Sequence, residues 1–415
     1  MNILYLTQHF ATLRSKFGAR HWWVTERLSE EGHNVTVLTG PGALPDDIQK
    51  TNPKGVVDVG AKSEIRIIPA KYSQKMGFVK RFVSFTRYML GSIFYVLTCR
   101  RPDLIIATST PLSVVVPALV GWWFRRIPFV FEVRDRWPAG PIALGKVKNP
   151  ILKFLMRRVE ASAYKHAKKI IALSPGMKDG IIADGVPEDR ITVITNMADI
   201  DSFRPDVDGS QIRKQYGIEN KFVVGYAGTM GFVNGCNTII DAARECLTRE
   251  DIVFILIGDG NEKPGMLKRV EHEKINNVIF LDPVPRYMVP NIVAAMDITL
   301  MTIRYFKIKE ENSANKFFDY LASGTPVLLN YGGWQAEWLK KYSAGTNAMP
   351  DDAHDLARII MEFSQQKDLL VEMGRNARKL AENEFSFKIL LNRYAVTIAQ
   401  VGEVIKSRTG GNGKS

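Results

Sequence analysis

Residues 311–329 read ENSANKFFDYLASGTPVLL, and this stretch indicates the fold better than any other part of the chain. Its first part has the spacing of a short amphipathic helix. We expect that helix to end at Gly324, because glycine readily adopts the left-handed conformation that terminates helices. The apolar run Val327-Leu328-Leu329 follows Pro326 and is typical of a buried strand. A helix that leads directly into a buried strand predicts a sheet with helices packed on its faces.

The same stretch carries two acidic residues, Glu311 and Asp319, eight positions apart. We expect Glu311 on the loop before the helix and Asp319 on the inner side of the helix, so that both carboxylates face one cleft. Such carboxylates suit the vicinal hydroxyls of a sugar or a ribose, because each oxygen can accept a charge-assisted hydrogen bond. The alternative is a capped helix with an exposed acid at each end, and the spacing alone favours neither interpretation.

Length and composition bound the class of protein. The 415 residues exceed one ordinary hydrophobic core and predict two domains of roughly 200 residues each. A hydrophobic content of 46% and a charged content of 24% fit a soluble globular protein. The three cysteines, Cys99, Cys236 and Cys246, show no metal-ligand or disulfide spacing, which favours a reducing compartment. A strand is expected at once, over residues 2–7, so no signal peptide is expected.

Short apolar segments alternate with helical patterns along the whole chain, which is typical of parallel sheets covered on both faces. We expect helices near 18–31, 77–99, 111–125, 149–167 and 175–183. We expect strands at 2–7, 33–38, 64–69, 103–108, 128–133, 169–173 and 190–195, and then at 222–226, 252–257, 278–281, 297–301 and 326–329. Residues 40–62, rich in Gly, Pro and Asp, are expected to form a surface loop.

The net charge of +13 lies entirely in the first half of the chain. Residues 1–200 hold 29 basic and 16 acidic residues, whereas the rest of the chain holds 27 of each. Basic pairs flank the apolar runs 88–99 and 112–124, which are shorter than the about 20 residues that span a bilayer. A basic rim around exposed aromatic side chains suits an anionic membrane surface. We expect this surface to include Phe78, Lys80, Arg81, Phe82, Phe85 and Arg87.

The basic half of the chain also fits two alternatives to a membrane. The first is ordinary core helices with solvated charged ends, which the run 112–124 favours. The second is nucleic acid, which we rank lower because no nucleic-acid-binding motif accompanies the charge.

Glycine turns follow several of the expected strands. Gly228 and Gly231 lie between the strand at 222–226 and a helix from about Asn237, and Gly258-Asp259-Gly260 follows the strand at 252–257. Gly18 precedes the first expected helix. Glycine allows the backbone to approach an anion closely, and a helix N-terminus adds free amides and a positive dipole end. Because parallel sheets bind ligands beyond the carboxyl ends of their strands, these turns together predict a phosphate site.

These motifs together resemble glycosyltransferase family 4, whose members have the architecture called GT-B. The resemblance covers essentially the whole chain. It rests on Gly18-Ala19-Arg20, the segment from Glu31 to Val37, Val193 to Asn196, Phe203-Arg204-Pro205, Gly228, Gly258-Asp259-Gly260 and the acid pair. The segment from Glu132 to Pro138 is similar to the subgroup that builds surface polysaccharides, such as the fucosamine transferases of O-antigen and capsule clusters.

The resemblance implies an α/β fold with two Rossmann-like domains facing a central cleft. An acceptor-binding, membrane-facing domain would cover residues 1–198, and a nucleotide-sugar-binding domain would cover 199–384. A helix over 385–405 would return to the N-terminal domain, and 406–415 would form a disordered tail.

The resemblance also assigns roles to residues. Glu311 would contact the hydroxyls of the donor sugar, and Asp319 would contact the ribose. The diphosphate would lie at Gly228, Thr229, Gly231 and Gly258, with Gly18 beside it. Relatives commonly carry an Arg and a Lys that grip the phosphates, but Thr229 and Asn234 stand at those positions. Lys316 or Arg304 would then supply the positive charge. Asp replaces the more usual Glu at position 319, which shortens its reach by one methylene.

Asp135 falls near the position at which many relatives carry a histidine in the cleft, so the resemblance implies a catalytic role for it. The alternative is an ion pair with Arg134 or Arg136 that merely fixes the loop.

The implied reaction is retaining transfer of a hexose, N-acetylated amino sugars included, from a UDP-linked or other nucleotide diphosphate sugar to a lipid-linked glycan acceptor. It would occur at the cytoplasmic face of the inner membrane, with no metal or other cofactor. No paired aspartates suited to Mg²⁺ and no zinc-like histidine spacing stand out, which agrees. A nucleotide-sugar 2-epimerase of the same architecture, or a non-enzymatic basic protein that binds membrane or nucleic acid, remains the alternative.

Overall fold

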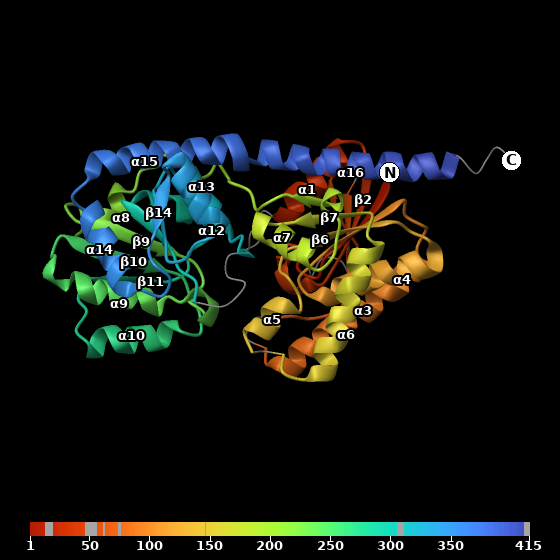
Figure 1. The fold of residues 1–415 in the computed structure, drawn as a ribbon, viewed down its shortest axis with the longest axis horizontal. Helices are drawn as coiled ribbons and strands as arrows, with labels where there is room; N and C mark the ends of the chain where they lie inside the picture. Colours follow the sequence, from red (N-terminus) through yellow and green to blue (C-terminus); the bar gives the residue numbers. More distant parts are fainter. Residues whose placement is uncertain are drawn as a thin grey trace. The chain divides into compact units, whose positions relative to one another are not determined.

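The computed structural model describes residues 1–12, 20–45, 56–60, 63–73, 76–145, 147–304 and 311–410. The chain forms two compact units (Figure 1). Unit 1 comprises Met1–Thr195 and Leu390–Ser415, and unit 2 comprises Asn196–Ile389. The expected domain limits at 198 and 384 lie within five residues of these divisions.

Unit 1 contains an eight-stranded sheet with the order β3-β4-β2-β1-β5-β6-β7-β8. All neighbouring strands are parallel except β3 and β4, which pair antiparallel. Its strands are β1 (Asn2–Leu6), β2 (Asn34–Thr39), β3 (Val56–Gly60), β4 (Ser63–Ile67), β5 (Leu104–Thr108), β6 (Phe129–Val133), β7 (Lys169–Ala172) and β8 (Ile191–Val193). The loop prediction for 40–62 was wrong at β3, an edge strand whose short apolar alternation is masked by flanking Gly, Pro and Asp.

The helices of unit 1 cover this sheet. They are α1 (Arg20–Glu30), α3 (Phe78–Thr98), α4 (Val115–Arg125), α5 (Ala139–Ala143), α6 (Pro150–His166), α7 (Pro175–Ala183) and the larger part of α16 (Phe387–Gly410). The prediction of a disordered tail from 406 was wrong over 406–410, because α16 continues to Gly410. Residues 411–415 of that predicted tail lie outside the described residues.

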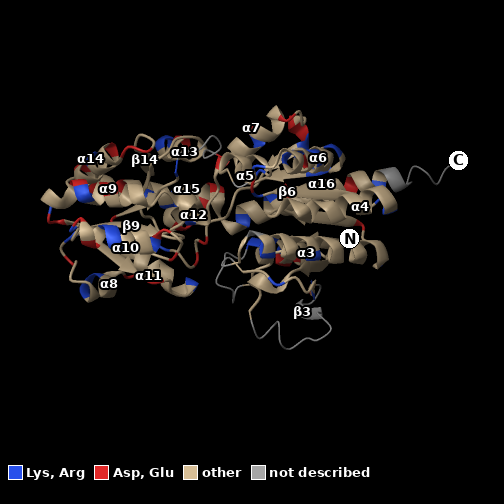
Figure 2. Cartoon of the chain, turned by 90° about the horizontal axis from the view of Figure 1, so that it is seen from below, with Lys and Arg blue, Asp and Glu red and all other residues tan. Residues whose placement is uncertain are grey.

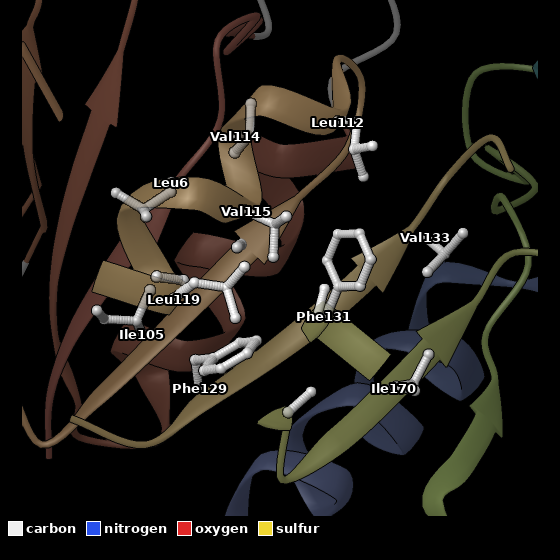
Figure 3. Close-up of a cluster of buried hydrophobic side chains, with 14 of the residues drawn as sticks. Leu6, Ile105, Leu112, Val114, Val115, Leu119, Phe129, Phe131, Val133 and Ile170 are labelled. Atoms are coloured by element: carbon white, nitrogen blue, oxygen red, sulfur yellow. The ribbon is translucent and has the colours of Figure 1, made fainter. Parts of the chain in front are cut away.

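The core of unit 1 lies between the sheet and α4 (Figure 3). Strands β5 and β6 are buried along their whole length, which explains their uninterrupted apolar sequences. Leu119 of α4 packs with Ile105 and Phe129 in this cluster. A Cβ on Gly121 would lie 3.0 Å from both Ile105 and Val96, so a small residue lets α4 approach β5 and α3 closely.

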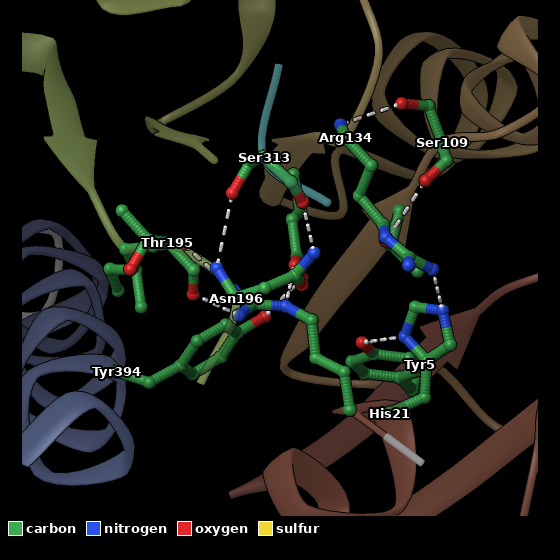
Figure 4. Close-up of polar contacts among 12 residues, drawn as sticks. Tyr5, His21, Ser109, Arg134, Thr195, Asn196, Ser313 and Tyr394 are labelled. Carbon is green, nitrogen blue, oxygen red and sulfur yellow. Dashed lines mark hydrogen bonds and ion pairs between the residues drawn. The ribbon is translucent and has the colours of Figure 1, made fainter. Parts of the chain in front are cut away.

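A buried ion pair joins distant segments of unit 1. The Arg20 Nε donates to Glu132 Oε1 at 2.8 Å, and the Tyr394 hydroxyl of α16 donates to Glu132 Oε2 at 3.1 Å. Arg20 also donates to the carbonyls of Ile194 and Thr195 at the end of β8 (Figure 4). These bonds connect α1, β6, β8 and α16, and they show how the last helix docks on the N-terminal domain.

Unit 2 contains a six-stranded, all-parallel sheet with the order β11-β10-β9-β12-β13-β14. Its strands are β9 (Phe222–Ala227), β10 (Ile252–Ile257), β11 (Val278–Leu281), β12 (Ile298–Met301), β13 (Val327–Leu329) and β14 (Gly345–Asn347). The sequence missed β14, whose Gly-Thr-Asn carries no apolar signal. The predicted architecture of two Rossmann-like domains is confirmed.

Helices cover the unit 2 sheet, and one of them belongs to the stretch that predicted the fold. They are α8 (Ser210–Gln215), α9 (Asn237–Glu245), α10 (Lys263–His272), α11 (Val289–Ala294), α12 (Asn315–Ala322), α13 (Trp334–Tyr342), α14 (Ala353–Phe363) and α15 (Lys367–Leu380). Helix α12 ends as expected: Gly324 adopts a φ of +66°, and its N–H donates to the Leu321 carbonyl at 3.0 Å.

Removing the buried carboxylate of Glu132 should destabilise unit 1 strongly. Glu132→Ala should lower the free energy of unfolding by about 3–5 kcal/mol, because Arg20 would stay buried without its counter-ion. Urea denaturation followed by circular dichroism measures the change. Glu30→Ala is the control, since Glu30 forms an exposed pair with Arg27 and should cost less than about 1 kcal/mol. Equal losses in the two variants would contradict a dominant role for the buried pair.

Candidate functional site

Two glycine turns pack backbone to backbone at the carboxyl ends of β9 and β10 in unit 2. The Gly228 N–H donates to the Ile257 carbonyl, and the Met230 N–H donates to the Asp259 carbonyl, both at 2.9 Å. A Cβ on Gly258 would lie 1.9 Å from the Gly228 oxygen, and Gly258 has a φ of +143°. Glycine is therefore required at 258 by the packing itself. Within 228–231, the amides of Thr229 and Gly231 have no acceptor in the described part of the chain.

The hydroxyl of Tyr226 connects this turn to Lys316. It donates to the Thr229 carbonyl at 2.8 Å and accepts a hydrogen bond from Lys316 Nζ at 2.7 Å. The ammonium also lies 3.9 Å from the centre of the Tyr226 ring. A Cβ on Gly228 would come within 2.8 Å of Lys316 Nζ, so the structure brings this predicted cation to the glycine turn. Burial lowers the pKa of Lys316 to about 8.

Arg304, the other predicted cation, is already paired. Its guanidinium donates to Glu262 Oε1 at 3.0 Å and to the Phe232 carbonyl at 3.1 Å, and it lies 4.0 Å from the centre of the Phe232 ring. Lys316, in contrast, forms no ion pair with a carboxylate of the described residues. Lys316 is therefore the better placed of the two to meet an anion at the glycine turn.

Glu311 lies before α12 and Asp319 lies within it, which agrees with their expected positions along the chain. That both carboxylates face one cleft stays a prediction. Glu311 is half-buried, and the segment that follows it is held by side chains of unit 2. The Trp334 Nε1 donates to the Asn312 carbonyl at 2.9 Å, and Asn196 bonds to Ser313 (Figure 4). These contacts order the backbone between the two acids.

The Asp319 carboxylate is buried and bound by Arg286, which sequence reasoning missed. Arg286 Nη1 and Nη2 donate to the two carboxylate oxygens, each at 2.8 Å. Burial raises the pKa of Asp319, and the guanidinium opposes that rise. Arg286 begins a 3-10 turn soon after β11. The only sequence signal was a basic residue just beyond the carboxyl end of a strand.

In unit 1, Asp135 follows β6 and is exposed. The two arginines beside it are engaged elsewhere: Arg134 Nη1 contacts His21 Nε2 at 2.6 Å, and Arg136 Nη2 donates to Asp184 at 2.9 Å. Desolvation by the surrounding protein raises the pKa of Asp135, and the positive charge of Arg134 opposes that rise. Arg134 therefore acts electrostatically on Asp135, and these contacts decide neither the catalytic role nor the loop-fixing ion pair.

Behind Arg134 lies a buried histidine that the sequence did not single out as functional. His21 Nε2 must accept from Arg134, because a guanidinium only donates. Its Nδ1 therefore carries the proton and donates to the Tyr5 hydroxyl at 2.9 Å (Figure 4). Burial first, and then Arg134 and Arg20, lowers the pKa of His21 well below its ordinary value. A neutral His21 thus orients Arg134 at the carboxyl end of β6.

Two further points complete the site. Gly18, predicted to lie beside the diphosphate, falls outside the described residues. Among the residues that the structure covers, no group of three or more His, Cys, Asp and Glu side chains could hold a metal ion.

Comparison with known proteins identifies the family. Residues 18–197 match the family model described as Glycosyl transferase 4-like domain, and residues 208–380 match Glycosyl transferases group 1. WcaI of Escherichia coli (strain K12), named as a putative colanic acid biosynthesis glycosyl transferase, is 24% identical over 268 residues. The alignment covers 62% of this chain and 65% of WcaI, so the chain spans just under two thirds of that relative.

Solved structures share the fold. Sucrose-phosphate synthase from Thermosynechococcus elongatus has a TM-score of 0.76 at 15% identity, over 97% of this chain and 99% of that one. HepE of Anabaena, solved in complex with UDP-glucose, has a TM-score of 0.71 at 18% identity, over 96% of this chain and 100% of that one.

The two Rossmann-like domains and the two matching models define a glycosyltransferase of the GT-B class. More particularly, the chain belongs to glycosyltransferase family 4, as the motifs predicted, and it has relatives named for colanic acid biosynthesis and for capsular polysaccharide biosynthesis.

The position of Lys316 predicts that anion binding depends on pH. Inorganic diphosphate should bind most tightly below pH 8, where the amine is protonated, and more weakly as the pH rises past about 8. Lys316→Met should bind diphosphate roughly 10-fold or more weakly at pH 7, because a charge-assisted hydrogen bond is removed. The variant should also lose the dependence on pH that the lysine causes. Titration calorimetry between pH 7 and 9.5 measures both. Lys341→Met, at an exposed position of α13, is the control; a parent protein without pH dependence would argue against this site.

Proposed function

We propose that this protein is a retaining glycosyltransferase that uses a nucleotide diphosphate sugar, with UDP as the carrier. It moves a hexose, N-acetylated amino sugars included, to a hydroxyl of a lipid-linked glycan acceptor in surface polysaccharide synthesis. The observation that carries this proposal is the contact of Lys316 with Tyr226 and the turn at Gly228. A cation at a glycine turn beyond a parallel strand suits a diphosphate. HepE, solved with UDP-glucose, supports UDP as the carrier.

In this proposal the leaving diphosphate is stabilised mainly by electrostatics. Negative charge develops on the diphosphate as the bond to the sugar breaks, and Lys316 would meet that charge together with the amides of Thr229 and Gly231. Glu311 would bind hydroxyls of the donor sugar, and Asp319 would bind the ribose. Asp135 would accept the proton of the acceptor hydroxyl or orient that hydroxyl. Retention of configuration and the lack of a metal come from the family resemblance.

Product analysis tests the reaction. Mass spectrometry of incubations with a panel of UDP-sugars and a lipid-diphosphate glycan should find a glycosylated lipid and free UDP. Asp135→Asn should lower kcat by roughly 100-fold while the protein stays folded, since proton transfer to a positioned base is lost. Conversion of the free UDP-sugar without any acceptor would support the 2-epimerase instead. A parent protein that neither binds UDP nor forms a glycosylated product would support the non-enzymatic alternative.

The lipid-linked acceptor gains support from an exposed apolar surface on unit 1. Helix α3 packs on α4, which packs on α6, and the views show the three helices together (Figures 1 and 2). Each helix carries a strongly exposed apolar side chain, such as Phe94 (71%) of α3, Phe124 (75%) of α4 and Ile151 (69%) of α6. The other exposed members are Val79, Phe82, Val83, Leu90, Leu97, Trp123, Phe154 and Leu155. Large exposed apolar side chains on neighbouring helices suit a surface that contacts a membrane or another protein.

The residues predicted to face the membrane differ in their exposure. Lys80, Phe82 and Arg87 are exposed, and Arg81 is half-buried. Phe85 is also half-buried and stacks on Tyr72 at 5.8 Å between ring centres. The side chain of Phe78 lies outside the description. Phe82 and Phe94 of α3 are therefore better placed to enter lipid than Phe85.

Basic side chains accompany this surface. Lys80 and Arg87 of α3 and Arg157 and Arg158 of α6 are exposed. No helix among the described residues is both long enough and apolar enough to cross a bilayer. We therefore propose peripheral docking of unit 1 at the cytoplasmic face of the inner membrane, through exposed aromatic residues and attraction to anionic lipids.

Vesicle sedimentation tests the docking. The parent protein should bind phosphatidylglycerol vesicles more strongly than phosphatidylcholine vesicles, and less strongly as salt screens the charges. Arg157→Glu with Arg158→Glu should weaken binding by roughly 10-fold or more, because each basic residue contributes about 1 kcal/mol near the surface. Lys340→Glu with Lys341→Glu in unit 2 is the control. A parent protein that ignores anionic vesicles at low salt would contradict the docking.

A further inference from the structure

Arg286 pairs with Asp319 in unit 2, and the proposed reaction gives this arginine no role. Two hydrogen bonds of 2.8 Å join the guanidinium fork to the two carboxylate oxygens. The Asp319 side chain is only 8% exposed, whereas that of Arg286 is 40% exposed. The pair therefore lies at the boundary between the core and the surface, with the acid on the inner side.

Other contacts also hold Arg286 in place. Its guanidinium carbon lies 4.8 Å from the centre of the Phe203 ring, and Phe203 is fully buried. Arg378 donates to the carbonyls of Phe203 and Ala322, at 2.8 and 2.7 Å. The platform under Arg286 is thereby tied to the end of α12, the same helix that carries Asp319. The acid and the arginine are thus linked through side chains that contact the same helix.

The geometry of the pair leaves the carboxylate able to bind a ligand. Each carboxylate oxygen can accept about two hydrogen bonds, and the fork uses one on each. Two acceptor positions therefore remain, held in fixed directions by a planar partner. These two positions diverge, so a vicinal diol can donate through one hydroxyl to one of them, and its second hydroxyl can accept from an N–H of Arg286 that the fork does not use. A lone buried carboxylate, in contrast, would favour its neutral form and could rotate.

We propose that Arg286 is a positioning residue of the nucleotide site. It keeps the Asp319 carboxylate ionised and in one orientation, so that the acid–arginine pair binds the ribose diol together. This inference rests on the proposed function, since it takes the ligand of Asp319 to be a nucleotide. The resemblance implies Glu rather than Asp at position 319. The shorter Asp319 fits this role because Arg286 holds its carboxylate in place.

Removing the ribose hydroxyls from the ligand gives a direct test. Titration calorimetry compares UDP with 2′,3′-dideoxy-UDP for the parent, Arg286→Gln, Arg286→Lys, Asp319→Asn and the Arg286→Gln/Asp319→Asn double variant. The parent should prefer UDP by roughly 10- to 100-fold, the worth of a charge-assisted hydrogen bond. Arg286→Gln and Asp319→Asn should each lose most of that preference, and the double variant should lose no more than either. Arg286→Lys should restore part of it, because it returns the charge without the fork.

The outcomes separate the role of Arg286 from folding and from the proposed function. If Arg286 had a purely structural role, Arg286→Gln would weaken the binding of both nucleotides equally and leave the preference for UDP unchanged. That result would overturn the inference. Arg358→Gln, which removes an exposed arginine paired with Asp355 and Glu362 on α14, should leave the preference intact as the control. A parent protein that binds neither nucleotide would refute the proposed donor itself. A parent that binds both equally would refute only the contact between Asp319 and the ribose, and with it the role of Arg286.

Discussion

The candidate site in unit 2 depends on the close packing of one backbone turn against another. The Gly228 oxygen occupies the space that a side chain at Gly258 would need, and hydrogen bonds from Gly228 and Met230 close the two turns together. This contact sets the path of the chain after β9. Tyr226 then fixes the Thr229 carbonyl on one side and the Lys316 ammonium on the other. A cation is thus held at the turn before any ligand arrives, which lowers the cost of binding an anion.

Two ion pairs with a buried carboxylate join segments that lie far apart in sequence. Arg20 and Glu132 connect the first helix, the sheet and the last helix of unit 1. Arg286 and Asp319 connect the end of β11 to α12 in unit 2. A charge in the core is tolerated only when a partner compensates its desolvation, so each pair also dictates which segments must meet. The exposed basic residues of α3 and α6 in unit 1 lie instead on its surface, beside exposed apolar side chains.

Much of the fold could be predicted from the sequence because buried parallel strands carry their own signal. Segments such as β5, β6 and β10 are apolar along nearly their whole length, and they lie within one or two residues of their predicted bounds. The exceptions were segments whose structure depends on a neighbour. β3 and β14 are short edge strands that only pairing stabilises, and residues 406–410 continue a helix that begins at Phe387.

From the sequence by itself, local patterns predicted two α/β domains, the glycine turns and the position of both acids along the chain. These patterns are apolar periodicity, glycine after a strand, and charge along a helix. The family and the Rossmann-like architecture came from the resemblance of the motifs to glycosyltransferase family 4. Only the tertiary structure decided that Lys316 rather than Arg304 is available at the glycine turn, that Arg286 holds Asp319, and that a neutral His21 orients Arg134. The reason is physical. Which partner a charged side chain meets depends on contacts between segments tens or hundreds of residues apart, and no local pattern records them.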